Sequence, residues 1–279
     1  MKFGYVSTAR LSRRRVGSKE GGAFRTVRTV LPVPALCTLA LVLVAWQITS
    51  LVVDPALTSS PIEVLNDFFA LAASGALWNA LGTSLQELAV GAALGISSGF
   101  LLGVLMSEVP VARALLAPVV NFFNATPLVV LIPLLVLIVG ISSSARITFV
   151  VTITIWPMLL NVVAGLRNVK RSYLEVGRAF GYRGLPLLLR IKLPAAMPYV
   201  FAGLRNAVGL AIIGMIVGEM EVSSAGLGFL LILFGDEFRI GQLFAVLIPT
   251  SCLGVVAVGL LRIGQARFYP WIAAVGGRR

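Results

Sequence analysis

Long apolar runs separated by short polar segments fill the chain from residue 31 onward. A membrane-spanning helix needs about 20 predominantly apolar residues, because the hydrocarbon core of a bilayer is about 30 Å thick. Six runs meet this requirement and predict six transmembrane helices. Their approximate bounds are 31–53, 85–106, 115–140, 147–166, 199–220 and 243–263.

Two other apolar segments are too short to cross a bilayer. Segment 68–78 lies in the loop 54–82, and Trp78 at its end favours an interfacial helix, because tryptophan prefers the headgroup level. Segment 226–234 follows the fifth span and predicts a re-entrant or interfacial segment. The run 31–53 is longer than the apolar region of a signal peptide, and no A-x-A site follows it, so we expect a retained span.

The composition places the chain among polytopic membrane proteins. Apolar residues make up 58% of the sequence and charged residues 12%, whereas soluble domains carry about 25% charged residues. We predict an all-α fold with a basic tail, a first transmembrane helix, an external loop that holds the interfacial helix, a core of five transmembrane helices and a second tail. These parts are 1–30, 31–53, 54–82, 83–271 and 272–279.

The net charge of +12 would suggest a nucleic-acid partner in a soluble protein. With six spans, however, all but two of the 23 lysines and arginines fall on one side of the membrane, and the exceptions are Arg146 and Arg239. The positive-inside rule makes that side cytoplasmic. We therefore expect cytoplasmic termini, a basic tail resting on anionic membrane lipid, and no nucleic-acid partner.

Glycine recurs at every fourth residue of the second span. At 3.6 residues per turn this spacing places the glycines on one nearly continuous bare stripe. Helix backbones pack closely in lipid only where side chains are small, so the stripe predicts a packing face, either within this chain or against a second copy. The glycines are Gly91, Gly95, Gly99 and Gly103.

Three prolines interrupt the third span, and each removes a backbone hydrogen bond. Polar residues lie beside the breaks, and such segments are tolerated in lipid only where protein or a water-filled path covers them. Both a pathway-lining helix and ordinary hydrogen bonding between helices fit this pattern. The prolines are Pro118, Pro127 and Pro133, and the candidate pathway residues beside them are Asn121, Asn124 and Thr126.

Acidic residues lie near the external ends of two spans. Glu87 begins the second span, and Glu219 and Glu221 end the fifth. Charged residues inside spans are functional candidates, but at span ends the commoner outcome is that the charge reaches the interface. We keep Glu219 as a fourth candidate pathway residue.

The segment 170–194 is a polar island between the fourth and fifth spans, with six basic residues and the single acid Glu175. Ser172 can cap a short helix in which Glu175 closes a capping box, and Gly181 can end that helix. A second helix is expected to begin at Leu185-Pro186. Two short helices hinged at a glycine would present an apolar knob with a charged rim, which is typical of recognition by insertion of a helix into a groove.

The apolar knob comes from leucines spaced at i, i+3 and i+4, namely Leu185, Leu188 and Leu189. Pro194 and Pro198 are expected to end the island and begin the fifth span.

The island resembles the cytoplasmic loop of permease subunits of binding-protein-dependent ABC importers. The pattern of that loop is Glu-Ala-Ala, three residues, Gly, nine residues and Ile-x-Leu-Pro. The matching residues here are Glu175, Gly181, Ile191, Leu193 and Pro194. The two alanines are replaced by Val176 and Gly177, and the glycine is expected to weaken the first helix by about 1 kcal/mol.

The resemblance extends over about 83–271. Segments 126–140, 193–220 and 226–228 are similar to the nitrate/sulfonate/taurine-type group of these permeases. The resemblance implies the transmembrane-domain fold of type I ABC importers, in the cytoplasmic (inner) membrane of a prokaryote. It also implies that the ATPase-coupling loop includes Glu175, Gly181, Tyr182, Arg183, Leu185, Leu188, Ile191 and Pro194.

The partners that the resemblance implies are two ABC ATPase subunits, a second copy of the chain or a related permease, and an extracytoplasmic solute-binding protein. The substrate would be a small anion such as nitrate, a sulfonate or taurine. The sequence contains no G-x-x-x-x-G-K-[ST] loop, so ATP and Mg²⁺ are expected on the partner ATPase, and this chain is expected to be no enzyme and to bind no cofactor.

Two other classes of function remain as alternatives. A secondary transporter without an ATPase is the first, but such folds tend to show inverted repeats and the sequence contains no clear internal repeat. A membrane-embedded enzyme is the second, but the sequence has no histidine and its two cysteines, Cys37 and Cys252, lie in separate apolar runs. The same residues leave no pattern for a metal site.

Overall fold

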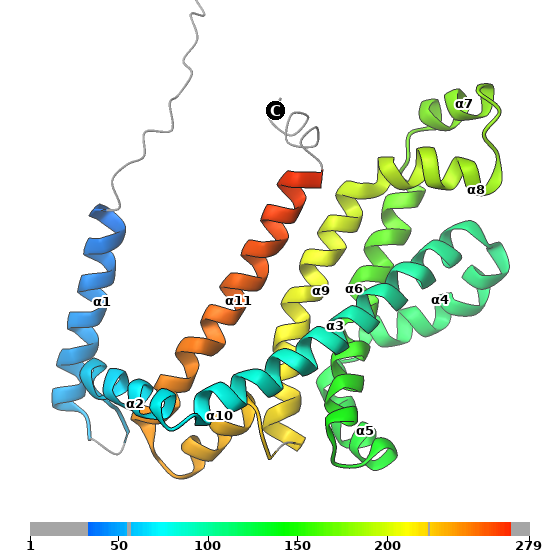
Figure 1. Cartoon of the computed structure of the whole chain (residues 1–279). Helices are drawn as coiled ribbons and strands as arrows, with labels where there is room; N and C mark the ends of the chain where they lie inside the picture. Colours follow the sequence, from blue (N-terminus) through cyan, green and yellow to red (C-terminus); the bar gives the residue numbers. More distant parts are fainter. Residues whose placement is uncertain (1–32, 55–56, 223, 269–279) are drawn as a thin grey trace, which may run out of the picture. The chain divides into compact units, whose positions relative to one another are not determined.

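The computed structural model describes residues 33–54, 57–222 and 224–268, and it is all-helical over these residues (Figure 1). The two predicted tails, 1–30 and 272–279, lie outside them. The chain divides into two units between Ala45 and Trp46. The helices are α1 Val33–Val52, α2 Pro61–Ala73, α3 Ala76–Glu108, α4 Pro110–Ala125, η1 Leu128–Leu131, α5 Ile132–Val139, α6 Ser143–Arg167, α7 Arg171–Ala179, α8 Gly184–Leu187, η2 Leu188–Lys192, α9 Leu193–Val222, α10 Leu227–Asp236 and α11 Ile240–Phe268.

Four helical segments among the described residues are long and apolar enough to cross a membrane. They are α3, α6, the continuous helix Gly184–Val222 and Ile240–Gln265 of α11. The third predicted span would be a fifth if α4 and the helix after it are counted together. The described part of α1 contains a shorter apolar helix, Leu36–Val52. The described residues therefore contain four or five spans by length and composition, and the sixth stays a prediction.

The third predicted span is broken into two helices that differ in direction by 102°. The break lies at Pro127: α4 ends at Ala125, and Thr126 has an extended backbone with ψ 131°. Proline disfavours the helical conformation of the residue before it, which explains why the helix ends there. Pro118 stays inside α4, whereas Pro133 lies in the first turn of α5, where its missing N–H removes no helical hydrogen bond.

Helices α3, α6 and α9 pack together at the centre of the second unit (Figure 1). Met158 and Val162 of α6 meet the fully buried Ala196 and Ala207 of α9 in one apolar cluster. Phe100 of α3 packs against the same cluster. These contacts hold the spans side by side and place the polar residues described below between them.

The glycine stripe of α3 is buried and faces α6. A Cβ atom at Gly91 would lie only 2.6 Å from Cβ of Val150, and one at Gly103 would lie 2.8 Å from Cβ of Val162. The two helices therefore approach at a distance that leaves no room for side chains on this face. The stripe therefore packs against another helix of this chain. Its spacing had also allowed packing against a second copy of the chain.

Two predicted loop regions differ in the structure. The loop 54–82 does contain a short helix, but its expected bounds of 68–78 are wrong: α2 is Pro61–Ala73, Gly75 has the left-handed φ of 81°, and Trp78 lies in the first turn of α3. A gap separates the predicted second span, 85–106, from the predicted third, 115–140, but this gap is not a loop. Only Val109, with an extended backbone, separates α3 from α4.

Candidate functional site

The segment 170–194 projects beyond the neighbouring ends of α6 and α9 (Figure 1). Its first helix, α7, ends as the sequence predicts, with Gly181 in the left-handed conformation at φ 81°. The N–H of Gly181 donates to the carbonyl of Arg178 at 3.0 Å, and the N–H of Tyr182 donates to that of Gly177 at 3.0 Å. Glycine adopts this conformation without steric cost, so it sets the hinge between α7 and α8.

The capping box predicted at the start of α7 is wrong. The helix begins at Arg171, and its N-cap is Lys170, which makes no side-chain cap hydrogen bond. Ser172 already lies inside the helix. A capping residue needs a non-helical backbone, so Ser172 cannot serve as one.

The second helix does not end at Pro194, as the sequence suggested. Helix α8 continues through the π-helical turn η2 into α9, and the whole segment Gly184–Val222 is one uninterrupted helix. The N–H of Leu193 donates to the carbonyl of Leu188, five residues earlier. Such π turns make local adjustments inside a helix, and this one immediately precedes Pro194. A displacement of α8 would therefore be passed directly to α9.

Gly177 is buried where α7 packs against the second helix. A Cβ atom there would lie 2.8 Å from Cδ1 of Leu187 and 3.0 Å from Cγ1 of Ile191. The glycine that weakens α7 as a helix thus also allows α7 to lie close to α8 and η2. Leu187 is the buried leucine of this contact, and the i, i+3, i+4 pattern of the sequence did not identify it.

The projecting segment exposes large apolar side chains. Tyr173 and Val176 lie at i and i+3 on α7, Phe180 follows at i+7 as the C-cap of this helix, and the three are 51%, 54% and 79% exposed. That spacing is the helical signal by which the sequence could have revealed them. We call these three residues the apolar face of α7. Leu185 and Leu189 of the predicted knob are also exposed. Leu188 instead packs against the apolar cluster of α6 and α9 that contains Val162 and Ala196.

Charged and polar residues make up much of the rest of segment 170–194. Glu175 and Arg183 are exposed. The guanidinium of Arg190 lies 5.3 Å from the centre of the Tyr182 ring, and its Nη1 is 3.3 Å from the Tyr182 hydroxyl. Lys192 pairs with Glu108 at the end of α3, with 2.7 Å between Nζ and Oε2. The segment is therefore joined to α3 by an ion pair and to α9 by a continuous helix.

The four candidate pathway residues do not form one site. Asn121 and Asn124 are exposed on α4, and the Thr126 hydroxyl donates to the carbonyl of Phe122 at 2.8 Å. Glu219 lies elsewhere, fully buried at the end of α9, where Oε2 accepts from the N–H of Gly228 at 2.8 Å.

Glu87 and Arg146 form a buried ion pair between α3 and α6. The Nε of Arg146 lies 2.9 Å from each carboxylate oxygen of Glu87, and its Nη2 bonds both Glu87 and the hydroxyl of Ser143. The two residues are only 2% and 7% exposed. The expectation that charges at these span ends reach the interface is therefore wrong for Glu87 and Glu219, whereas Glu221 is exposed.

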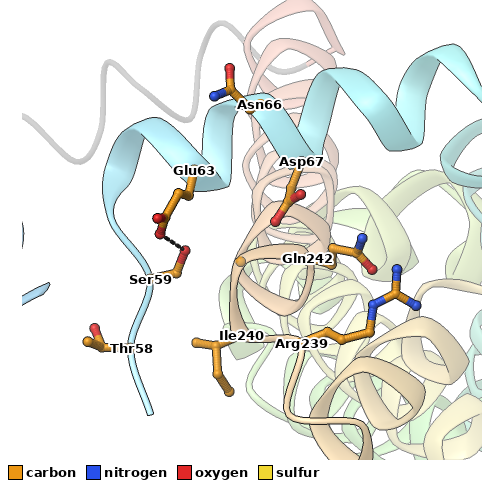
Figure 2. A pocket seen from close by; sticks show the side chains of 9 residues that line it. Thr58, Ser59, Glu63, Asn66, Asp67, Arg239, Ile240 and Gln242 are labelled. Atoms are coloured by element: carbon orange, nitrogen blue, oxygen red, sulfur yellow. Dashed lines mark hydrogen bonds between the residues drawn. The ribbon is translucent and has the colours of Figure 1, made fainter. Parts of the chain in front are cut away.

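A polar pocket of about 400 Å³ opens between the start of α2 and the start of α11. In Figure 2, Glu63 and Asp67 extend from α2, and Gln242 and Arg239 lie on the α11 side. Glu63 is committed to a capping box: its Oε2 accepts from the N–H of Ser60 and from the hydroxyl of Ser59, both at 2.9 Å. This carboxylate therefore fixes the start of α2.

Hydrogen bonds hold the pKa of the Glu63 carboxyl below the ordinary value of a glutamate. The backbone N–H of Ser60 contributes most, followed by the Ser59 and Ser60 side chains. The stabilisation is present above the ordinary pKa and is lost as the pH falls through the lowered one. We expect Ser59→Ala to raise the titration midpoint of Glu63, measured by ¹³C NMR of the carboxyl, whereas Ser74→Ala at the other end of α2 leaves it unchanged. A parent midpoint at or above the ordinary value would contradict this prediction.

Comparison with known proteins identifies the family. Residues 91–272, which include the glycine stripe and the projecting segment, match the family described as the binding-protein-dependent transport system inner membrane component. The chain belongs to this family. It is an ABC importer permease of the nitrate/sulfonate group, a transport subunit that crosses the inner membrane several times. Permeases of this family work with ATPase and binding-protein partners.

Curated relatives support this assignment. A probable ABC transporter permease protein of Haemophilus influenzae is 36% identical over 62% of this chain and 70% of its own length. The putative aliphatic sulfonates transport permease protein SsuC of Escherichia coli is 31% identical over 77% of this chain and 83% of its own. The nitrate import permease protein NrtB of Leptolyngbya laminosa is 28% identical over 66% of this chain and 64% of its own.

Solved structures show the same fold. A chain from an amino acid ABC transporter crystallised with histidines superposes with a TM-score of 0.60 at 15% identity, over 71% of this permease and 97% of that chain. A chain from the inward-facing MetNI methionine ABC transporter superposes with a TM-score of 0.51 at 22% identity, over 69% of this permease and 92% of that chain. The permease therefore has the transmembrane-domain fold of type I ABC importers.

Proposed function

We propose that the permease forms the translocation path of an ATP-driven importer for a small anion such as nitrate, a sulfonate or taurine. Two ABC ATPase subunits bind on its cytoplasmic side and carry the ATP and Mg²⁺, a second copy of the chain or a related permease completes the path, and an extracytoplasmic binding protein delivers the solute. The observation that carries this proposal is the projecting segment with its exposed apolar face of α7.

The apolar face of α7 is suited to a groove on the ATPase. Tyr173, Val176 and Phe180 are exposed at helical spacing, and the nearby basic residues Arg178 and Arg183 are exposed as well. Large exposed apolar patches mark interaction sites, and helices with apolar residues at this spacing bind in grooves. When the ATPases close around ATP, the segment moves with them.

Two connections pass this movement to the spans. The helix from Gly184 to Val222 is continuous, so displacement of α8 displaces α9. The pair between Lys192 and Glu108 ties η2 to α3, and the packing of Leu187 on Gly177 ties α8 to α7. The transmission therefore runs through the continuous helix and through these direct side-chain contacts.

The anionic substrate is supported by the names of the sulfonate and nitrate permeases among the relatives. Arg146, the buried cation of α6, is neutralised by Glu87, so we assign it to structure rather than to anion binding. Asn121 and Asn124, exposed on α4 beside the break in the third span, are the polar side chains that we assign to the path. They would face the second permease subunit across it.

We expect variants of the projecting segment to lose the ATPase. Phe180→Asp places a charge in the docked surface, and since burial of a phenylalanine side chain contributes about 1.5–3 kcal/mol, ATPase affinity should fall at least about tenfold. Glu175→Lys and Gly181→Pro should also abolish association, the latter because proline cannot adopt φ 81°. The measurement is co-purification of the ATPase with the permease, together with ATP hydrolysis in proteoliposomes.

Phe238→Asp is the matched control, because Phe238 is 66% exposed but lies in the turn between α10 and α11. It should retain the ATPase at the parent level. Full ATPase association and substrate-stimulated hydrolysis in all three segment variants would refute coupling through this segment. Uptake that continues without ATPase subunits would favour a secondary transporter instead.

A further inference from the structure

Glu219 is fully buried at the end of α9, yet no basic side chain in the part of the chain that the structure describes forms an ion pair with it. Acidic residues are almost never fully buried unless they are paired. Its Oε2 accepts a hydrogen bond from the N–H of Gly228, in the first turn of α10, at 2.8 Å. Within the described residues, no donor meets hydrogen-bonding geometry with its Oε1. The carboxylate is therefore used to hold the beginning of another helix.

Ser84 of α3 holds the same helix end. It is fully buried, and its hydroxyl oxygen accepts from the N–H of Leu227 at 2.9 Å. The first four N–H groups of a helix have no partner within the helix, and the helix dipole favours a negative charge there. Side chains from α3 and α9 thus satisfy two consecutive N–H groups at the start of α10.

Two glycines make room for the carboxylate. A Cβ atom at Gly226, where φ is 105°, would overlap the carboxyl group of Glu219. A Cβ atom at Gly228 would lie 2.7 Å from Cβ of Glu219. The Gly-Leu-Gly segment therefore forms a cradle that fits the Glu219 side chain, and Leu227 between the glycines is fully buried.

Helix α10 is too short to span a membrane, and it packs against α3, α9 and α11. Its Leu227 and Phe234 share a cluster with Leu77 of α3 and Val246 of α11. A short helix in this position is kept in place by its contacts and not by an anchoring span of its own. The hydrogen bonds at its first turn therefore contribute to holding α10 against α3 and α9.

We propose that Glu219 and Ser84 form a latch that holds α10 against the spans, and that this latch opens when the permease opens toward the extracytoplasmic binding protein. Glu219 is then a positioning residue for transport, acting through α10. This inference rests on the proposed function in one respect: the proposed function says that the permease opens toward the binding protein and therefore when the latch is released. The unpartnered Oε1 makes the closed state costly, because a buried oxygen without a hydrogen bond is not compensated for its lost hydration.

The test measures access to Leu227 in the assembled transporter. Leu227→Cys is introduced into a Cys37→Ser/Cys252→Ser background, and the complex with ATPase subunits in nanodiscs is treated with a membrane-impermeant maleimide. We expect slow labelling in this parent and labelling at least tenfold faster with Glu219→Ala. Glu219→Gln should be intermediate, because its amide oxygen can still accept from Gly228. Glu221→Gln, two residues away at an exposed position, should label at the parent rate.

A second measurement distinguishes release of the latch from a general loss of folded structure. Glu219→Ala should raise ATP hydrolysis in the absence of binding protein severalfold, whereas a merely structural loss would lower it. If Glu219→Ala does not assemble, Ser84→Ala and Glu219→Gln provide the same comparison. Parent-rate labelling in assembled Glu219→Gln and Ser84→Ala complexes would overturn the latch. Labelling does not require transport, so failure of ATP-driven uptake by the parent would refute the proposed function separately.

Discussion

Arg146→Met is expected to destabilise the permease by about 3–5 kcal/mol, because it leaves the buried carboxylate of Glu87 without its counter-charge. The loss should appear as a lower midpoint of unfolding in mixed detergent micelles. Ser143 cannot compensate, since its hydroxyl bonds the arginine that has been removed. Of the ion pairs in the described residues, this one is the most buried, so its disruption should be the most costly.

The double variant Glu87→Met/Arg146→Met should recover most of this stability. Replacing both members of a buried pair by apolar side chains of similar volume is often neutral, because the desolvation cost of the charges disappears together with their attraction. Arg239→Met is the matched control: its pair with Glu237 is about half exposed, and its loss should cost about 1 kcal/mol or less. A double variant no more stable than Arg146→Met would show that the pair has a role beyond mutual neutralisation.

The features predicted best from the sequence depend on local chemistry. Run length identified the long apolar helices, and Pro127 indicated the break in the third span, although nothing local indicated that the two halves would differ in direction by 102°. Gly181 ends α7 because the left-handed conformation is a property of that residue. In each case the residues that carry the sequence signal are the residues that adopt the predicted conformation, or their near neighbours in the chain.

The features that the sequence did not predict depend on which helix faces meet. Glu87 and Arg146 are 59 residues apart, and their pairing requires α3 and α6 to turn these faces toward one another. The glycine stripe indicated a close helix contact, but it did not indicate that the partner helix is α6. Glu219 caps α10 only because Gly226 and Gly228 leave space for its side chain. The spacing of these residues in the sequence does not reveal that they pack together.

Gly95→Ala is expected to destabilise the permease by about 1–3 kcal/mol, and Gly95→Leu by more. A Cβ atom at this position would overlap Oγ1 of the fully buried Thr154 and lie 2.8 Å from the backbone carbonyl of Val151. The threonine side chain cannot turn aside freely, because its hydroxyl donates to the carbonyl of Val150 at 2.7 Å. The helices must therefore separate, and the contacts of the whole stripe weaken with them.

Gly82→Ala provides the control on the same helix. Apart from its chain neighbours and the backbone of α3 itself, nothing lies within 4 Å of a Cβ built on Gly82, so the substitution should be neutral or stabilise α3 by up to about 1 kcal/mol through helix propensity. Adding Thr154→Ala to Gly95→Ala should restore part of the lost stability, but not all, because the Val151 carbonyl remains. Equal unfolding midpoints for Gly95→Ala and Gly82→Ala would contradict close packing of α3 on α6. Since α6 also packs on α9, the separation should slow ATP-driven uptake as well.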